Sequence, residues 1–100
     1  MTEFMGNISG EYDAKGKGFG PGCSSLHSTM TPHGPDAEAY EKAVKAEDKP
    51  LRIADGNFSF MFESGYMLST TTYAFDGGFA DLQKDYAECW EGLKTLKFEP

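Results

Sequence analysis

The pattern of apolar and polar residues predicts two strands in this chain of 100 residues. Residues 3–8 (EFMGNI) form one short run that is typical of a strand. In residues 57–64 (NFSFMFES), apolar rings recur at every second position and would line one side of a strand. We expect this aromatic stripe to pack in a core rather than to bind a cofactor; it consists of Phe58, Phe60 and Phe62.

Two further runs are compatible with strands. Residues 26–31 could form one, and they precede a turn that Pro32, Gly34 and Pro35 would impose. Residues 66–75 (YMLSTTTYAF) are rich in side chains typical of strands and follow the aromatic run after a short break at residues 64–65. That break predicts either a hairpin or a bulged continuation of the same strand.

Helical spacing of apolar residues predicts two helices that flank the strands. Asp36 is suited to cap a helix over residues 37–47. A second helix is expected over residues 81–94, with an apolar face made of Leu82, Tyr86, Cys89, Trp90 and Leu93. Cys89 would be a small buried hydrophobe on that face. Together these elements predict a mainly β chain with flanking helices, an α+β fold.

A glycine-rich segment, residues 10–25, follows the first strand and indicates irregular backbone that can approach a ligand closely. A phosphate-binding loop is disfavoured, because the segment lacks the Lys-Ser or Lys-Thr ending of that motif.

The composition and charge of the chain limit the kinds of partner that it could bind. A chain of this length is one small domain or part of a larger one, and its aromatic content of 14% is ample for a packed interior. The net charge of −7, without a cluster of Lys or Arg, argues against binding to nucleic acid or an anionic membrane. No apolar run is long enough to span a membrane. Cys23 and Cys89 do not form a paired-cysteine motif, which favours a reducing cytoplasm.

The chain has two histidines, His27 and His33, in the segment SLHSTMTPHGPD. Two imidazoles on one metal ion must come within a few ångströms of each other, whereas six extended residues span roughly 20 Å. The turn expected at Pro32 begins directly before His33, so most of the chain between the two histidines would be extended. We therefore expect one histidine to be a ligand and the other an acid-base or supporting residue. The alternative is that both are solvated loop side chains.

Two long segments carry a resemblance to a known family. Residues 3–43 (EFMGNISGEYDAKGKGFGPGCSSLHSTMTPHGPDAEAYEKA) and 52–64 (RIADGNFSFMFES) resemble the C-terminal portion of homogentisate 1,2-dioxygenases. The resemblance runs from about Glu3 to Trp90, nearly the whole chain. It implies that residues 1–100 are a C-terminal fragment of a cupin-like dioxygenase domain, with a partial jelly-roll β-sandwich. The expected arrangement is an incomplete antiparallel sandwich flanked by the two helices.

The family resemblance also implies an activity. It is the opening of the ring of homogentisate with O2 at a mononuclear non-haem Fe(II), which gives maleylacetoacetate in tyrosine and phenylalanine catabolism. A cytoplasmic location and a homo-oligomer at full length are the corresponding expectations.

Matched to the family motifs, Glu3 in EFMG and His33 in TPHGPD are the implied iron ligands, and His33 would also face the substrate. His27 in SLHS is the implied catalytic residue of the substrate pocket. Tyr12 in EYDAK is the implied substrate contact, although a tyrosine in a glycine-rich loop can equally be an ordinary loop aromatic.

The second iron-binding histidine of the family precedes the matched glutamate, and this sequence begins at Met1. We therefore expect a terminal Glu3 that frays, weak retention of iron and negligible activity for the isolated chain. Two alternatives from other classes stay open. One is a non-catalytic cupin-type module that holds zinc or no metal. The other is an orphan fragment whose exposed aromatic stripe recruits a partner.

Overall fold

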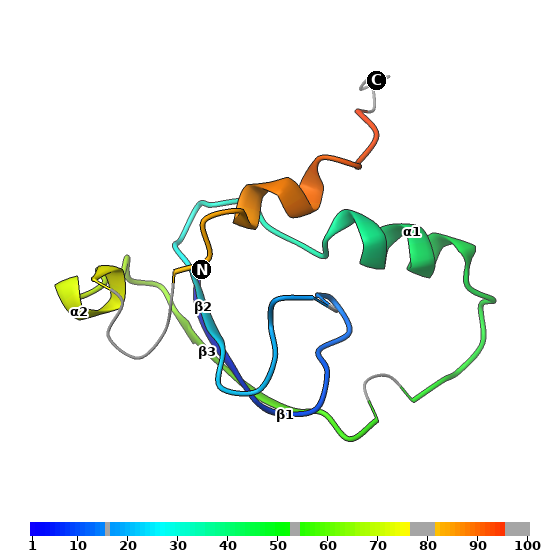
Figure 1. Cartoon of the computed structure of the whole chain (residues 1–100), viewed down its shortest axis with the longest axis horizontal. Coiled ribbons are helices and arrows are strands. Elements are labelled where there is room, and N and C mark those ends of the chain that lie inside the picture. The colour runs from blue at the N-terminus through cyan, green and yellow to red at the C-terminus, as the bar shows by residue number, and fades with distance from the viewer. Residues whose placement is uncertain (16, 53–54, 77–81, 96–100) are drawn as a thin grey trace.

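The computed structural model describes residues 1–15, 17–52, 55–76 and 82–95. Its centre is a three-stranded antiparallel sheet of order β2-β1-β3, made of β1 (Thr2–Ser9), β2 (Ser24–His27) and β3 (Phe58–Ser64). The predicted strands over residues 3–8 and 57–64 are confirmed. The third strand lies at residues 24–27 instead of 26–31, because the chain turns directly after His27. Sheet and helices together form a small mixed α+β structure (Figure 1).

The central strand β1 is held at its start by Thr2, whose side chain is fully buried. The Thr2 hydroxyl donates to the carbonyl of Tyr66 at 2.6 Å and accepts from the backbone N–H of Thr29 at 3.0 Å. These bonds connect the segments that follow β3 and β2 to the first residues of the chain. The expectation that Glu3 frays is therefore wrong, since Glu3 pairs with strands on both sides.

Asn7 anchors the glycine-rich loop to the sheet. It is 3% exposed, and its Nδ2 donates to the carbonyls of Gly10 and Phe19, both at 3.0 Å. Its Oδ1 accepts from Asn57 Nδ2 at 3.1 Å and from Ser59 Oγ at 3.2 Å. The loop therefore folds back over the same side of the sheet that Asn7 faces.

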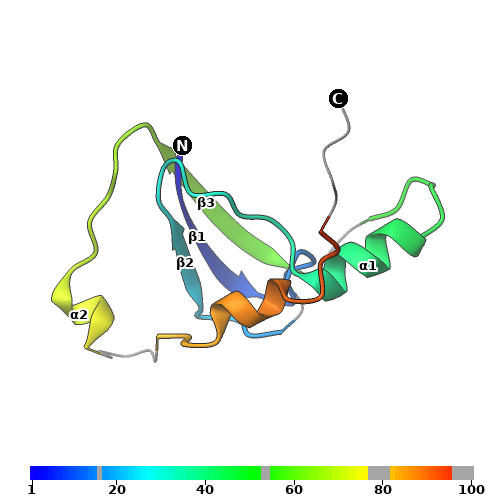
Figure 2. The same cartoon turned by 90° about the horizontal axis from the view of Figure 1, so that it is seen from above.

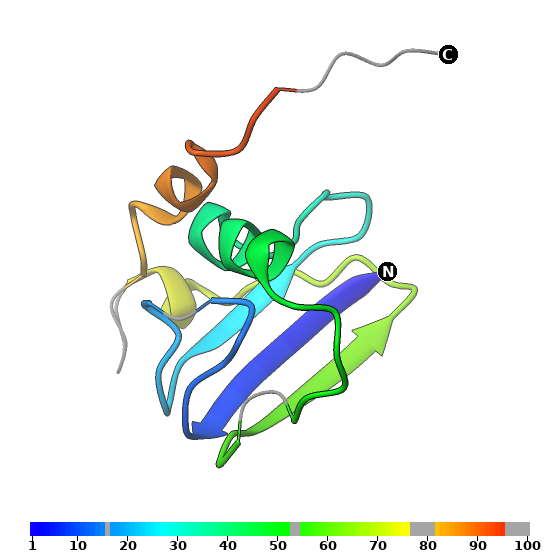
Figure 3. The same cartoon turned by 90° about the vertical axis from the view of Figure 1, so that its right-hand side faces the viewer.

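The helices lie mainly on one side of the sheet (Figures 1 and 3). Helix α1 (Ala37–Lys45) begins as predicted, with Asp36 Oδ1 accepting from the N–H of Ala39 at 2.7 Å, and it ends two residues early. A short 3-10 helix, η1 (Tyr86–Trp90), lies beside it. The short α2 (Thr72–Phe75) lies apart from both (Figure 2).

Two predicted elements are wrong. Residues 66–71 form no strand and residues 72–75 form α2, although the outer edges of β2 and β3 are unpaired among the described residues. The expected helix over residues 81–94 is reduced to η1, with Leu82 and Leu93 exposed and Cys89 half-buried. Residue 81 lies outside the described residues. An apolar face without a surface to cover is not enough to hold a long helix in water.

The aromatic stripe is also not a core within the described part of the chain. Phe4 lies opposite Phe62, and the Phe60 ring lies over Gly6, so these rings share one face of the sheet. Phe58 and Phe62 are 63% and 67% exposed. Among the described residues no second sheet covers this face, and the antiparallel sandwich is not formed.

The core of the described chain is correspondingly small. Its buried hydrophobic residues are Met5 and Phe19, both on the loop-covered side of the sheet. The radius of gyration is 15.3 Å, against about 13 Å for a compact domain of this length. None of the helices in the described residues has the length and apolar character that a membrane crossing requires.

Candidate metal centre

Glu3 and His27 lie side by side because of the strand register. Glu3 on β1 pairs with His27 on β2, and residues directly opposite in an antiparallel pair point to the same face of the sheet. That face is the one covered by the glycine-rich loop. The carboxylate thus comes from the middle strand of the sheet, and the imidazole comes from the last residue of β2.

His33 returns to the same point through a tight turn. The N–H of Thr31 donates to the carbonyl of Ser28 at 3.1 Å, and Met30 has a φ of 65° at the third position of this turn. The rings of His27 and His33 stack with centroids 4.1 Å apart and planes 6° from parallel. The expectation that the two imidazoles are separated by an extended chain is therefore wrong.

His33 is held through both of its ring nitrogens. Its Nδ1 lies 3.1 Å from the carbonyl of Thr31, and because a carbonyl only accepts, Nδ1 carries the hydrogen. Its Nε2 lies 2.7 Å from Glu3 Oε2. The bond to Thr31, followed by the bond to Glu3, raises the pKa of His33 above its usual value.

His27 has the opposite electrostatic environment. Burial lowers its pKa most, and the neighbouring His33 and Lys15 lower it further, while Glu3 acts in the other direction. Its Nε2 lies 2.9 Å from the hydroxyl of Tyr86 on η1. At neutral pH His27 is therefore a neutral imidazole. The pKa of the neighbouring His33 is instead raised, so His33 is protonated more easily than His27.

These three side chains suit a metal ion. The ligand atoms of Glu3, His27 and His33 all lie within 4.8 Å of one another. Two ligand atoms at right angles on an ion, each about 2.1 Å away, are about 3.0 Å apart, close to the separation of His33 Nε2 and Glu3 Oε2. Metal-bound imidazoles commonly donate their other N–H to a carbonyl, as His33 does to Thr31. Two imidazoles and a carboxylate are the donor set of non-haem Fe(II) oxygenases.

Tyr12 is the one proposed site residue that the structure does not bring into this cluster. Its ring packs edge-on against Phe19 with centroids 5.7 Å apart, and it lines a surface hollow with Asp13 and Glu38. Partial burial, and then the charges of Asp13 and Glu3, raise the pKa of its hydroxyl. Among the described residues, no hydrogen bond joins Tyr12 to the cluster.

Two neighbours of the cluster were not identified from the sequence. Tyr86 was assigned to the apolar face of a helix, and Lys15 was an unremarked residue of the glycine-rich loop. The two meet in the structure, since Lys15 Nζ lies 4.2 Å from the centre of the Tyr86 ring. No local sequence signal links residues 59 positions apart, such as His27 and Tyr86.

Comparison with known proteins finds relatives that match nearly the whole chain. Residues 1–97 match the family described as homogentisate 1,2-dioxygenase C-terminal. The chain is 54% identical over 95 residues to human homogentisate 1,2-dioxygenase, and 54% identical over 99 residues to the Rhizobium etli (strain CIAT 652) enzyme of that name. These alignments cover 95% and 99% of the chain but 21% of each relative, so the chain spans about a fifth of their length. The chain belongs to the homogentisate 1,2-dioxygenase family and corresponds to its C-terminal part.

Proposed function

We propose that this chain supplies two iron ligands and a catalytic histidine to a homogentisate 1,2-dioxygenase. The reaction would open the ring of homogentisate with O2 and give maleylacetoacetate, a step of tyrosine and phenylalanine catabolism. The observation that carries the proposal is the meeting of Glu3, His27 and His33 on one face of the sheet. The names of the relatives support the substrate.

Glu3 and His33 are the residues that would hold Fe(II). Their ligand atoms are already 2.7 Å apart, and His33 donates its other N–H to Thr31, which leaves Nε2 for the ion. Bound Fe(II) supplies a centre at which a ring hydroxyl and O2 can meet and exchange electrons. Because a proton now lies between Glu3 and His33, loading the site releases it.

His27 would act on the substrate rather than on the iron. Its Nε2 is engaged by the Tyr86 hydroxyl, and its lowered pKa keeps it neutral. A neutral imidazole can hold a ring hydroxyl by a hydrogen bond or move a proton to or from it. Tyr12 would be the substrate contact implied by the family resemblance, and its hydroxyl is close enough to the cluster that, after burial and the charge of Asp13, the charge of Glu3 also raises its pKa.

The remaining expectations are part of the same proposal. The exposed aromatic face would be covered by a second sheet in a cupin-like jelly roll, and the active protein would be a cytoplasmic homo-oligomer. The exposure of Phe58 and Phe62 supports the first of these expectations. A polypeptide of these 100 residues alone should then lack ring-cleaving activity.

A hybrid enzyme tests the proposal. The stretch of the human relative that matches this chain is exchanged for the chain's own 95 residues. We expect the hybrid enzyme to consume O2 in the presence of homogentisate and Fe(II), and Glu3→Ala to abolish this uptake. A folded hybrid that loads with iron but does not consume O2 with homogentisate would contradict the proposed function. A Glu38→Ala variant, which alters an exposed glutamate bound to Lys17, is the matched control.

A further inference from the structure

We propose that Tyr86 is a positioning residue that donates its hydroxyl hydrogen to His27 Nε2 and so fixes the hydrogen of His27 on Nδ1. The inference rests on the proposed function, because it assigns the state in which His27 meets the substrate. It follows from three contacts around the Tyr86 ring, which come from three separate segments of the chain.

The first contact is the hydrogen bond itself. The Tyr86 hydroxyl lies 2.9 Å from His27 Nε2, and the phenol is in its protonated form at neutral pH. A neutral imidazole has one N–H and one lone pair, so a bond at Nε2 decides which nitrogen carries the hydrogen. With the phenol as donor, Nε2 accepts and Nδ1 is the N–H.

The second and third contacts fix the Tyr86 ring. Lys15 Nζ lies 4.2 Å from the ring centre, and the Trp90 ring packs edge-on with centroids 4.9 Å apart. A cation over the face of a phenol attracts the ring and helps to hold it in place. Lys15 and Trp90 therefore fix the ring whose hydroxyl bonds to His27.

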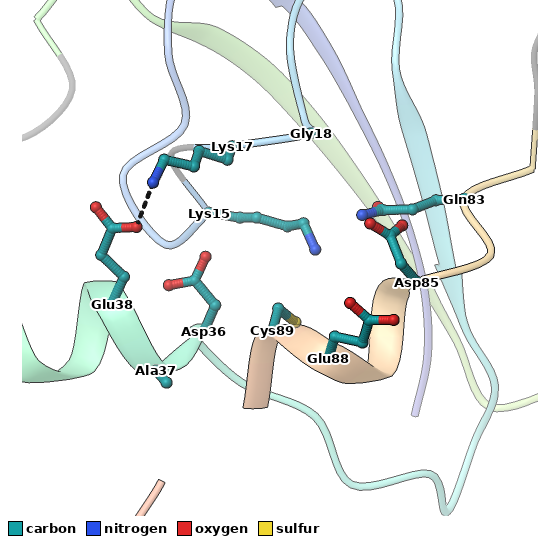
Figure 4. Close-up of a pocket in the computed structure, with 10 residues that line it drawn as sticks. All are labelled: Lys15, Lys17, Gly18, Asp36, Ala37, Glu38, Gln83, Asp85, Glu88 and Cys89. Atoms are coloured by element: carbon teal, nitrogen blue, oxygen red, sulfur yellow. Dashed lines mark hydrogen bonds and ion pairs between the residues drawn. The ribbon is translucent and has the colours of Figure 1, made fainter. Parts of the chain in front are cut away.

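The position of Lys15 supports this role. Its Nζ is buried and has no hydrogen-bond partner among the described residues, so the Tyr86 ring is the contact that orients it. Figure 4 shows the Lys15 side chain extending from the glycine-rich loop toward η1, along a cavity of about 470 Å³. Lys17 points away from it, toward Glu38 on α1. A buried ammonium without an oxygen partner is costly, so the contact with the Tyr86 ring helps to stabilise it.

The consequence for the chemistry concerns the direction of proton movement. With its hydrogen on Nδ1, His27 is a donor at that nitrogen and cannot accept a proton there. Without Tyr86 the ring could adopt either form. One hydrogen bond of ordinary strength shifts such an equilibrium by about five- to ten-fold. Tyr86 would thus determine which nitrogen of His27 can give a proton and which can take one.

Nitrogen NMR on the 100-residue chain tests the inference without metal or substrate. Spectra of the ring nitrogens, recorded at a pH where neither histidine is protonated, report directly which nitrogen carries the hydrogen. In the unmodified chain we expect His27 to show hydrogen on Nδ1. Tyr86→Phe keeps the ring and its contact with Lys15, and should shift the ratio of the two His27 forms about five- to ten-fold toward hydrogen on Nε2.

Two controls separate positioning from folding. The ring nitrogens of His33, which bond to Thr31 through Nδ1 and to Glu3 through Nε2, should not change in Tyr86→Phe. Tyr40→Phe, which alters a tyrosine on α1 that is 45% exposed, should leave both histidines unchanged. Lys15→Met, which removes the charge over the ring, should shift His27 in the same direction as Tyr86→Phe but by less.

Three results would overturn the inference. One is hydrogen on Nε2 of His27 in the unmodified chain, which would make Tyr86 the acceptor. Another is an unchanged His27 in Tyr86→Phe. The third is an equal change in His27 and His33, which would assign Tyr86 to folding alone. None of these readouts requires iron or homogentisate, so a failure of the proposed function is detected separately, in the hybrid enzyme.

Discussion

Asn7→Ala should destabilise the fold more than any other polar substitution on the loop-covered face. The Asn7 side chain makes four hydrogen bonds of 3.0 to 3.2 Å while it is 3% exposed. At roughly 1 kcal/mol for each bond, and with water replacing the bond at the exposed Gly10 carbonyl, the loss is about 3 kcal/mol. The Phe19 carbonyl would be left without a donor.

Urea unfolding followed by circular dichroism measures this loss. For a small protein with a urea slope of about 1.5 kcal/mol per M, the midpoint should fall by about 2 M. Ser59→Ala is the matched control, because Ser59 Oγ bonds to Asn7 and Asn57 but holds no part of the loop. That control should cost about 1 kcal/mol. A midpoint for Asn7→Ala no lower than that of Ser59→Ala would refute the reasoning.

Three further predictions concern the helix, the metal and the exposed face. Asp36→Ala removes the cap of α1 and should cost about 1 kcal/mol in thermal unfolding, whereas Asp36→Ser should cost less; equal losses would contradict the capping role. The Fe(II) affinity of the site should fall as the pH is lowered. The fall should begin above pH 6.5, because the pKa of His33 is raised and its proton competes with the metal. A calorimetric titration of Fe(II) that shows no dependence on pH would argue against Glu3 and His33 as ligands. Phe62→Ser should reduce the binding of an apolar dye to the 100-residue chain and its self-association in sedimentation. Unchanged dye binding and self-association would show that the aromatic face is not the surface through which the chain associates.

The elements predicted correctly are those in which a local pattern coincides with a local cause. Strand β3 follows the alternation of its residues, and the short run predicted for β1 pairs with it. Helix α1 begins directly after Asp36, because the Asp36 carboxylate accepts a hydrogen bond from the N–H of Ala39. The elements predicted wrongly lack side-chain packing within the described residues. Residues 66–71 have the composition of a strand, but they do not pair with the open edges of the described sheet, because β-propensity reflects packing against neighbours more than composition.

The candidate site was predicted in its residues but not in its geometry. Glu3, His27 and His33 were identified by resemblance, while their convergence depends on a strand register and on a turn at Met30. A positive φ at a turn is usually predicted from a glycine or asparagine in the sequence, and the methionine at position 30 gives no such indication. Tyr86 could not be found, because the contact joins η1 to the end of β2 without any local pattern.

The iron content of His33→Ala and His27→Ala variants of the hybrid enzyme tests the central claim most directly. We predict that His33→Ala loses its iron, since it removes a ligand whose Nε2 lies 2.7 Å from Glu3 Oε2. His27→Ala should retain most of its iron, while O2 uptake with homogentisate falls by about 10²-fold or more. Metal analysis and steady-state O2 uptake on the same samples separate the two roles. Equal loss of iron in both variants, or iron retained by His33→Ala, would contradict the assignment of Glu3 and His33 as ligands with His27 acting on the substrate.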